Sequence, residues 1–509
     1  MARESSSDAR APRLRAALTF AILTFACALL AFPYWLHESF GDVSLAQVVF
    51  QWRHMGGASS LPHHVAIGFV GQCVLGPMIL AAIVTWFVAA ARRWSAARPA
   101  GGLAMRRTIA RATAVMQWAM FGIALSAFAS ETDAMGLLAP AGLSDYFATH
   151  YVPPASVQLR PQARKNLVLV YVESLETAYT RPELFERDLL APLTAQGPAS
   201  FHAYQQMPGT GFTIAAVVST QCGVPLHTLG LLDANQQGER VEAFLPNAVC
   251  LGDILAAQGY RNVFMGGASL DFSGKGRFLR AHHYDELYGR EEWMRDGIPG
   301  SRISGWGLHD DDLFDRAKAK LRELHDAGRP FNLTVLTVDT HRPSGYRSPG
   351  CAVGEKAAPG MDGIVECAAG QVADLIRFVR SSGYGADTQV VVIGDHLSPP
   401  NELSDRLARA PERHIYNGFF SDSKPQPNRS TIVHFDMLPT ILDFVGLHVD
   451  GGRMGLGSSG FGNAAGGAAV DASRAEQAAG LQKPSNAYWA LWTPRGADRT
   501  GTGAVVAGR

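Results

Sequence analysis

Three uncharged, apolar runs in the first third of the chain limit its fold more than any other feature. They cover residues 16–36, 65–91 and 112–130, and each can cross the hydrocarbon core of a bilayer, which takes about 20 helical residues. A cleaved signal peptide is the alternative for the first run, but that run ends in Phe-Pro-Tyr-Trp rather than in small residues, and two more runs follow it. The sequence therefore predicts a transmembrane region over 16–130 with three spans.

The arginines around these runs predict the orientation of the chain. Residues 1–15 and the loop between the second and third runs are rich in arginine, whereas the loop 37–64 holds only Arg53. By the positive-inside rule, residues 1–15 are cytoplasmic and everything after the third span lies outside. We therefore expect a multi-pass protein of the cytoplasmic (inner) membrane whose large domain is periplasmic or otherwise extracytoplasmic.

The charge balance limits the partners of the chain. Lysine plus arginine and aspartate plus glutamate number 45 each, so the formal net charge is zero. Nucleic-acid-binding domains are usually strongly basic, so we expect no nucleic-acid partner. The sequence does not reveal the oligomeric state.

Four of the six cysteines fall in the part expected outside the membrane: Cys222, Cys250, Cys351 and Cys367. An even number there fits two disulfides in an oxidising compartment. Proximity in the sequence favours Cys222–Cys250 and Cys351–Cys367, although three connectivities exist and four buried free thiols are the alternative. No Cys-x-x-Cys pair supports a zinc site.

The exported part reads as one α/β domain over 163–450. A polar connector, 131–162, precedes it, and a Gly/Ala-rich segment, 451–509, follows it as a low-complexity tail. Short β-branched runs alternate with helical patterns in the domain, which is typical of a mostly parallel sheet covered by helices. The expected strands are 166–172, 332–338, 389–393 and, more weakly, 262–265.

Acidic and imidazole side chains follow three of these strands. Glu173 follows the first, Asp339 and His341 the second, and Asp395 with His396 the third. Open α/β sheets bind ligands at the carboxyl ends of their strands, so these side chains should meet at one edge. For any one of them a helix cap or a solvated turn is the alternative.

Glu173, Asp395 and His396 offer mixed oxygen and nitrogen ligands, which suit a divalent ion such as Mn²⁺ or Zn²⁺. A hydroxyl nucleophile should lie on a turn or helix start near the same edge. Thr213, in the Gly-rich segment 209–216, is the candidate, with an ordinary N-cap as the alternative.

Three other catalytic motifs fail in this sequence. The segment 273–277 lacks the first glycine and the Ser/Thr of a phosphate-binding P-loop. Cys222 is followed by Gly-Val-Pro, so proline stands at the third position after it, not the second as in the Cys-x-Pro-x-Arg nucleophile motif of sulfatases. There is no Gly-x-Ser-x-Gly elbow of a serine hydrolase.

The chain resembles the membrane-bound phosphoglycerol transferases of the alkaline phosphatase/sulfatase-like superfamily. It is nearest to those that decorate periplasmic glucans, and lipoteichoic acid synthases are more distant. The resemblance covers roughly residues 40–457. It rests on an ordered set of blocks: 166–176, 209–216 with 220–226, 264–275, 306–310, 337–343 and 394–397.

The resemblance implies a role for each residue that matches the family's motifs. Glu173, Thr213, Asp395 and His396 would bind one divalent metal, Mn²⁺ with Mg²⁺ or Zn²⁺ as alternatives, and Thr213 would be the nucleophile. His341 would contact the phosphoglycerol group and act as acid or base. Lys275 stands where the synthases carry a substrate-binding arginine. Those enzymes also have a histidine in the block that here reads Met265-Gly-Gly267, and a tryptophan where this chain has Ser273.

The implied reaction is metal-dependent transfer of phosphoglycerol from phosphatidylglycerol to a glycan hydroxyl, through a covalent threonine intermediate. A phosphoethanolamine transferase or a sulfatase-like phosphoester hydrolase is the nearest alternative, since the headgroup is not readable from these residues. A non-catalytic, membrane-anchored binding component is the alternative from another class.

Overall fold

The computed structural model describes residues 10–40, 67–96, 102–132, 134, 145–227, 239, 241, 243–351, 360–462, 473–483 and 485–492. Several predicted features lie wholly or partly outside these residues. They are the first nine residues of the cytoplasmic segment, the start of the second span, most of the connector before residue 145, and residues 463–472 and 493–509 of the tail.

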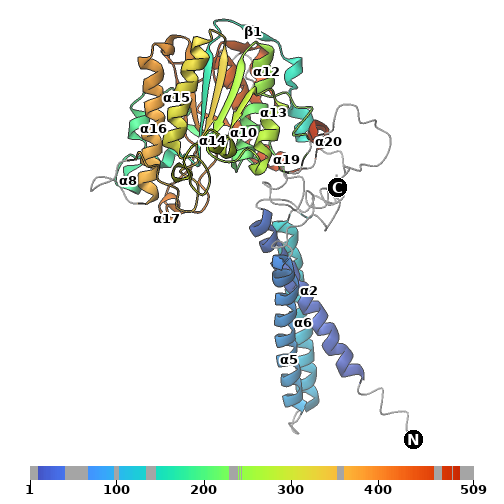
Figure 1. The fold of residues 1–509 in the computed structure, drawn as a ribbon. Coiled ribbons are helices and arrows are strands. Elements are labelled where there is room, and N and C mark those ends of the chain that lie inside the picture. Colours follow the sequence, from blue (N-terminus) through green and yellow to red (C-terminus); the bar gives the residue numbers. More distant parts are fainter. Residues whose placement is uncertain are drawn as a thin grey trace.

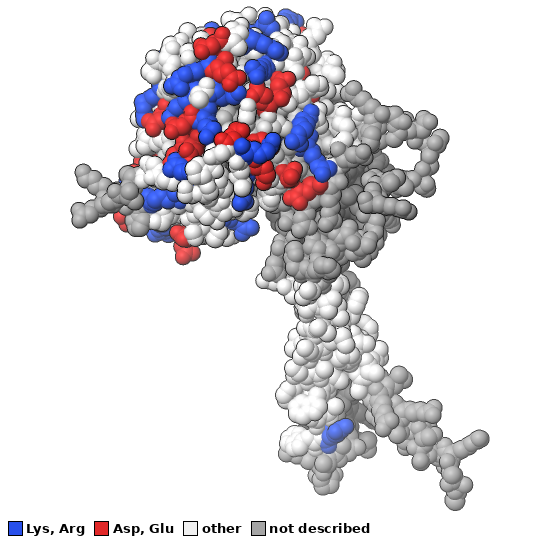
Figure 2. All heavy atoms as spheres, in the orientation of Figure 1, with Lys and Arg blue, Asp and Glu red and all other residues white. Residues whose placement is uncertain are grey.

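Three long helices carry the apolar runs and lie side by side (Figure 1). They are α2 (Arg10–Phe40), α5 (Gly76–Ala96), which continues a π-helical turn at Val70–Leu75, and α6 (Gly102–Glu131). Their stretches Ala16–Leu36, Ile67–Ala91 and Arg111–Glu131 are long and apolar enough to cross a membrane. In Figure 2 the described surface of these helices is almost free of charge, whereas basic and acidic side chains are interspersed over the visible face of the domain.

A six-stranded sheet forms the centre of the domain, in the order β5-β4-β6-β2-β7-β8. The first five strands are parallel and β8 is antiparallel to β7. The strands are β2 (Asn166–Val172), β4 (Arg261–Gly266), β5 (Glu286–Tyr288), β6 (Phe331–Leu336), β7 (Thr388–Gly394) and β8 (Asn417–Phe420). The predicted α/β class with a mostly parallel sheet is confirmed.

Both faces of the sheet are buried, which explains the continuous apolar runs. Along β2, Leu167, Leu169 and Tyr171 belong to one hydrophobic core, whereas the alternating Val168 and Val170 belong to the other. Successive strand residues point to opposite faces, so a strand between two helical layers must be apolar at every position.

Each core is closed by its own layer of helices (Figure 1). The layer over the first core comprises α7 (Tyr146–His150), α10 (Thr213–Cys222), α12 (Leu251–Ala257), α13 (Lys275–Ala281), α18 (His434–Phe444), α19 (Arg474–Leu481) and α20 (Asn486–Trp489). The layer over the second core comprises α8 (Pro182–Phe185), α9 (Ala191–Thr194), α14 (Arg290–Arg295), α15 (Asp310–Asp326), α16 (Met361–Ser381) and α17 (Ser404–Leu407).

Three two-stranded pairings complete the described fold. They are β1 (Leu159–Pro161) with β10 (Leu447–Val449), β3 (Ala203–Gln205) with β9 (Thr431–Val433), and β11 (Arg453–Met454) with β12 (Gly457–Ser458).

The packed domain extends beyond the predicted boundaries at both ends. Residues from 145 onward, expected in the connector, already contribute Phe147 to the first core. On the other side, Met454, Phe461 and Tyr488, expected in a low-complexity tail, are buried in the same core. The tail prediction was too broad for these residues because a few large apolar side chains, widely spaced among glycine and alanine, are enough to anchor a segment.

The two disulfides join the cysteines that are close in sequence, Cys222–Cys250 and Cys351–Cys367, so both predicted pairings are confirmed. Cys222 is the last residue of α10 and Cys250 directly precedes α12. The first disulfide therefore fixes the carboxyl end of the helix that begins with Thr213.

Candidate active site

The site begins at the carboxyl end of β2, where Glu173 follows the strand. Its side chain is buried, and Oε1 accepts a hydrogen bond of 2.7 Å from Ser174 Oγ. The left-handed backbone of Ser174 (φ 55°) turns the chain away from the strand direction. Ser174 N then donates to Oδ1 of Asp395 at 2.7 Å, which ties the end of β2 to the end of β7.

Asp395 and His396 follow β7 directly, and both are buried. His396 Nδ1 donates to the carbonyl oxygen of Leu397 at 2.9 Å, so its Nε2 is the nitrogen left for another partner. That Nε2 lies 3.4 Å from Asp395 Oδ2 and 3.7 Å from Glu173 Oε1. The structure thus brings together the three side chains that the sequence predicts at this edge.

Thr213 reaches this cluster from the first residue of α10. Its Oγ1 donates to Glu173 Oε2 at 3.2 Å. The N-cap position belongs to Phe212, and the side chain of Thr213 does not cap the helix. The alternative of an ordinary N-cap is therefore not what the structure shows.

The donor set fits a divalent cation. Ligand atoms of Glu173, Asp395 and His396 all lie within 4.8 Å of one another. Asp395 Oδ2 is buried without a hydrogen-bond partner, which is costly unless a cation or another donor meets it. A ligating histidine usually donates its second ring nitrogen to a carbonyl or carboxylate, as His396 does to Leu397.

The electrostatics of the cluster favour the binding of a cation. Burial raises the pKa of Asp395, and the neighbouring carboxylate of Glu173 raises it further. Burial also acts to raise the pKa of Glu173, but the charges of His396 and His341 and hydrogen bonds from Ser174 and Thr213 lower it below its ordinary value. Two buried carboxylates at this separation repel each other, and a bound cation would relieve that repulsion.

Lys275 lies near the same carboxylates, at the start of α13. Ser273 and Gly274 both have left-handed backbones (φ 60° and 69°) just before the helix, and the Lys275 side chain is buried. Burial lowers the pKa of Lys275 to about 8, and the negative charges of Glu173, Asp395 and Glu291 offset part of that lowering.

His341 is placed beside Glu173 by the turn that follows β6. Thr340 Oγ1 donates to the carbonyl oxygen of Glu173 at 2.6 Å. His341 Nδ1 donates to the carbonyl oxygen of Arg342 at 3.0 Å, which leaves Nε2 to accept or deliver a proton. One face of the His341 ring lies against Trp306, with 3.9 Å between the ring centroids.

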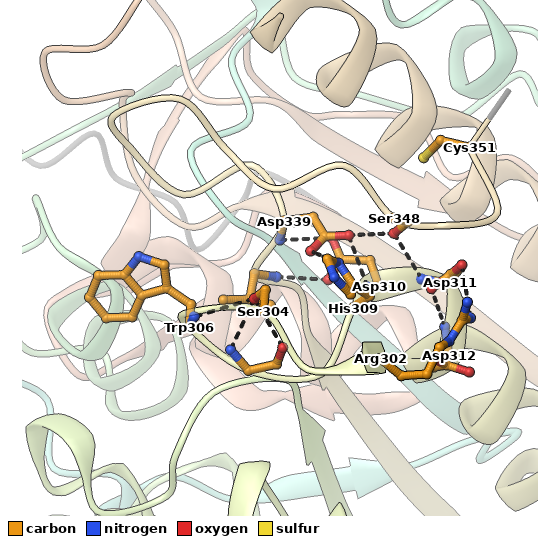
Figure 3. Close-up of polar contacts among 12 residues, drawn as sticks. Arg302, Ser304, Trp306, His309, Asp310, Asp311, Asp312, Asp339, Ser348 and Cys351 are labelled. Atoms are coloured by element: carbon orange, nitrogen blue, oxygen red, sulfur yellow. Dashed lines mark hydrogen bonds and ion pairs between the residues drawn. The ribbon is translucent and has the colours of Figure 1, made fainter. Parts of the chain in front are cut away.

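Sequence reasoning gave no role to a network of hydrogen bonds between Asp310 and Asp339 (Figure 3), although Asp339 lies two positions before His341. Asp310 accepts from the backbone amides of Val338 and Asp339. Asp339 in turn accepts from the backbone amide of Asp310 and pairs with His309 at 2.9 Å. Asp310 and Asp339 both lie in blocks that support the family resemblance, but nothing in their spacing shows that each caps the other's backbone.

This network also explains why β6 ends at Leu336, two residues before the predicted end. The amides of Val338 and Asp339 bond to the Asp310 side chain instead of continuing the ladder.

A second group with metal-ligating side chains consists of Cys222, Cys250 and His282. Its two thiols are joined in a disulfide. The two sulfur atoms therefore form a covalent cross-link. Among the described residues, the strand-end cluster of Glu173, Asp395 and His396 is the candidate active site.

The mostly parallel sheet with acidic, hydroxyl and imidazole side chains at its carboxyl edge defines a sulfatase-like α/β domain. The family model described as "Sulfatase" matches residues 165–447, which is more than half of the chain. The chain belongs to the Sulfatase family.

Curated relatives of this chain carry the name phosphoglycerol transferase I. Phosphoglycerol transferase I of Xanthomonas axonopodis pv. citri (strain 306) is 38% identical over 282 residues, covering 54% of this chain and 40% of the relative. The protein of the same name from Escherichia coli O127:H6 (strain E2348/69 / EPEC) is 36% identical over 325 residues, covering 62% of this chain and 41% of the relative. The resemblance to phosphoglycerol transferases is confirmed, and the match spans about two fifths of the length of these relatives.

Solved structures with a similar fold include the lipoteichoic acid synthase LtaP from Listeria monocytogenes, with 17% identity and a TM-score of 0.46 over 60% of this chain and 78% of that one. The periplasmic domain of EcEptC from Escherichia coli, in complex with Zn, gives 15% identity and a TM-score of 0.40 over 62% and 92% of the two chains.

Proposed function

We propose that this chain transfers a phosphoglycerol group from phosphatidylglycerol to a hydroxyl of a glycan, at the outer face of the cytoplasmic membrane. One observation carries the proposal: the hydroxyl of Thr213 donates to Glu173 within the buried strand-end cluster. The match to phosphoglycerol transferase I relatives supports the choice of group and donor.

The membrane-spanning helices suit a lipid donor. Three apolar helices would hold the domain at the bilayer surface, where phosphatidylglycerol is concentrated. The arginine-rich N-terminal segment and second loop place the domain on the opposite side from the cytoplasm. The two disulfides agree with that compartment.

Glu173, Thr213, Asp395 and His396 would hold one divalent metal, for which we propose Mn²⁺. When bound, such an ion polarises a phosphoryl oxygen and makes a nearby hydroxyl more acidic. Lys275 adds a buried cation beside the carboxylates and would bind the non-bridging phosphate oxygens.

In the first step, Thr213 Oγ1 attacks the phosphorus and its proton passes to Glu173 Oε2, the acceptor of its hydrogen bond. The bond between phosphorus and the diacylglycerol oxygen breaks, and that oxygen takes a proton from Nε2 of His341. The product of this step is a glycerophospho-threonine at Thr213.

In the second step, a glycan hydroxyl attacks the same phosphorus and gives its proton to Nε2 of His341. The bond from phosphorus to Thr213 breaks, and the threonine oxygen recovers a proton from Glu173. The resting protonation states of His341 and Glu173 are thereby restored, and both groups are ready for the next cycle.

The test is release of diacylglycerol from labelled phosphatidylglycerol by the full chain purified in detergent, with and without Mn²⁺. Thr213→Ala should abolish release, whereas Thr194→Ala, at an exposed position on α9, should not. Release from phosphatidylethanolamine instead of phosphatidylglycerol would contradict the proposed donor. Undiminished release by Thr213→Ala would contradict the proposed nucleophile.

A further inference from the structure

Two neighbouring aromatic side chains, one of which lies against His341, belong to neither hydrophobic core. Trp306 and Phe272 are only partly buried, and both are absent from the two core clusters and from the side chains packed against them. Their rings meet edge to face with 5.4 Å between centroids, and Trp306 also lies against His341 at 3.9 Å. Large aromatic rings that stabilise no core and border a reaction centre are available to a ligand.

The loop that carries Trp306 is held in one conformation. Ser304 Oγ accepts from the amides of Trp306 and Gly307, and Gly307 forms a bridge with Ala268. A Cβ at Gly307 would lie 1.9 Å from the carbonyl oxygen of Gly267, so this close approach requires glycine. The aromatic surface is therefore preorganised and does not have to be assembled on binding.

The same loop is tied to the turn that carries His341. The mutual capping of Asp310 and Asp339 and the pairing of Asp339 with His309 join the two segments, and Trp306 projects away from these contacts (Figure 3). Buried hydrogen bonds thus link the backbone segment that carries Trp306 to the turn that carries His341. A molecule stacked on Trp306 lies beside the imidazole that takes the acceptor proton in the proposed reaction.

The surroundings of the two rings favour a sugar over an acyl chain as the ligand. The residues that precede the two rings in sequence, Asp271 and Gly305, are exposed and polar or small, and Arg342, which follows His341, is exposed as well. The indole Nε1–H of Trp306 has no hydrogen-bond partner within the described part of the chain. A pyranose has an apolar face for the ring and hydroxyls for the polar rim, whereas an acyl chain would meet a rim that it cannot satisfy.

We infer that Trp306 and Phe272 form the acceptor subsite, on which a sugar ring of the glycan stacks with a hydroxyl directed toward His341. The inference rests on the proposed transferase function and adds to it the residues that select a carbohydrate acceptor.

The first experiment measures binding without turnover, in the full chain carrying Thr213→Ala, with a β-linked glucohexaose as the probe. Adding Trp306→Ala should weaken binding about tenfold, as expected for loss of one stacking contact, and Phe272→Ala should weaken it less. Trp306→Phe, which keeps a ring, should bind within about threefold of the parent. Tyr384→Ala is the matched control, since Tyr384 is a partly buried aromatic residue that packs against the second core.

Binding of the hexaose that is unchanged by Trp306→Ala would overturn the inference, and so would the absence of hexaose binding to the parent. An equal weakening of short-chain phosphatidylglycerol binding by Trp306→Ala would show that the rings do not select the sugar, and would overturn the inference as well. Equal thermal stability of the variants shows that they are folded.

The second experiment uses turnover in the otherwise wild-type chain. Trp306→Ala should raise the KM for the hexaose, and a loss confined to kcat would overturn the inference by showing that Trp306 only supports His341. If the wild-type chain releases no diacylglycerol but its hexaose binding depends on Trp306, the sugar subsite stands and the transferase proposal fails. The two proposals can therefore fail separately.

Discussion

Thr213 Oγ1 lies 3.2 Å from Glu173 Oε2, although 40 positions separate the two residues in the sequence. Glu173 extends from the end of a central strand, and Thr213 begins a helix of the layer above it. The contact places a hydroxyl at the edge of a buried carboxylate pair. The contact thereby joins the proposed nucleophile to the proposed metal site.

Glu173→Gln should separate the electrostatic role of this carboxylate from its effect on the fold. Without metal, the variant should be somewhat less stable than the parent. The charges of His396 and His341 and the hydrogen bonds from Ser174 and Thr213 hold the pKa of Glu173 below its ordinary value, so the folded chain favours the carboxylate over a neutral group. The parent should gain about 3 kcal/mol of stability from metal at about one hundred times its Kd, and the variant should gain much less. Thermal unfolding with and without Mn²⁺ after chelation measures both effects.

Glu183→Gln, on α8, is the control for this variant and should keep the full metal-induced gain. A Glu173→Gln chain that is stabilised by Mn²⁺ as strongly as the parent would remove Glu173 from the metal site.

The disulfide Cys222–Cys250 should affect the reaction as well as the stability. Replacing both cysteines with alanine should cost about 3 kcal/mol of unfolding free energy. Because Cys222 ends the helix that Thr213 begins, diacylglycerol release should also fall under conditions where the variant is still folded. Denaturant unfolding and the release assay, run on the same preparation, test the two effects.

The double variant Cys351→Ala/Cys367→Ala is the comparison, since that disulfide joins a loop to α16 and touches no residue of α10. Full activity of the Cys222→Ala/Cys250→Ala chain would show that α10 is held in place without the disulfide.

The central strands and the strand-end cluster could be predicted because their signals are local. A strand buried on both faces is apolar throughout, as Val168 to Val172 are, and the residue after it lies at the carboxyl edge of the sheet. Glu173, Asp395 and His396 follow from that rule alone. Thr213 was a candidate from its Gly-rich helix start, but an ordinary N-cap was an equal alternative until the family resemblance was considered, because the rule does not say which helix starts near the edge.

Two features could not be predicted because they depend on contacts between distant segments. The mutual capping of Asp310 and Asp339 joins the start of α15 to the turn after β6, and the sequence shows only an acidic helix start. The packing of Tyr488 depends on a surface that forms only when the first core is complete. In a segment rich in glycine and alanine, one tyrosine gives no periodic pattern.

The packed part of the expected tail should contribute measurably to stability. Tyr488 is buried in the first core, and its hydroxyl accepts a hydrogen bond of 3.0 Å from the amide of His227. Tyr488→Ala should lower the unfolding free energy by about 3 kcal/mol, and Tyr488→Phe by about 1 kcal/mol through the lost hydrogen bond. Asn486→Ala, at an exposed position on the same helix, should change it little. Equal stability of Tyr488→Ala and the parent would mean that α20 is not anchored by this side chain.

The pair of His309 and Asp339 should make the stability of the domain depend on pH. The hydrogen bond to Asp339 raises the pKa of His309 above its ordinary value, more than burial lowers it, and the charge of Arg302 opposes the shift only in part. A histidine whose pKa is higher in the folded state than in the unfolded state stabilises the fold fully below the unfolded value of about 6.5. That contribution is lost as the pH rises through the folded-state pKa.

The unfolding midpoint in urea should therefore fall between pH 6 and pH 9 in the parent, and this fall should be smaller in His309→Gln. The glutamine keeps an amide donor for Asp339 but does not titrate, so the difference between the two chains isolates the imidazole from the other titrating groups. Parallel pH profiles for the two chains would show that His309 is neutral throughout this range. The link between the Trp306 loop and the His341 turn would then depend on the neutral hydrogen bond and on the mutual capping of Asp310 and Asp339.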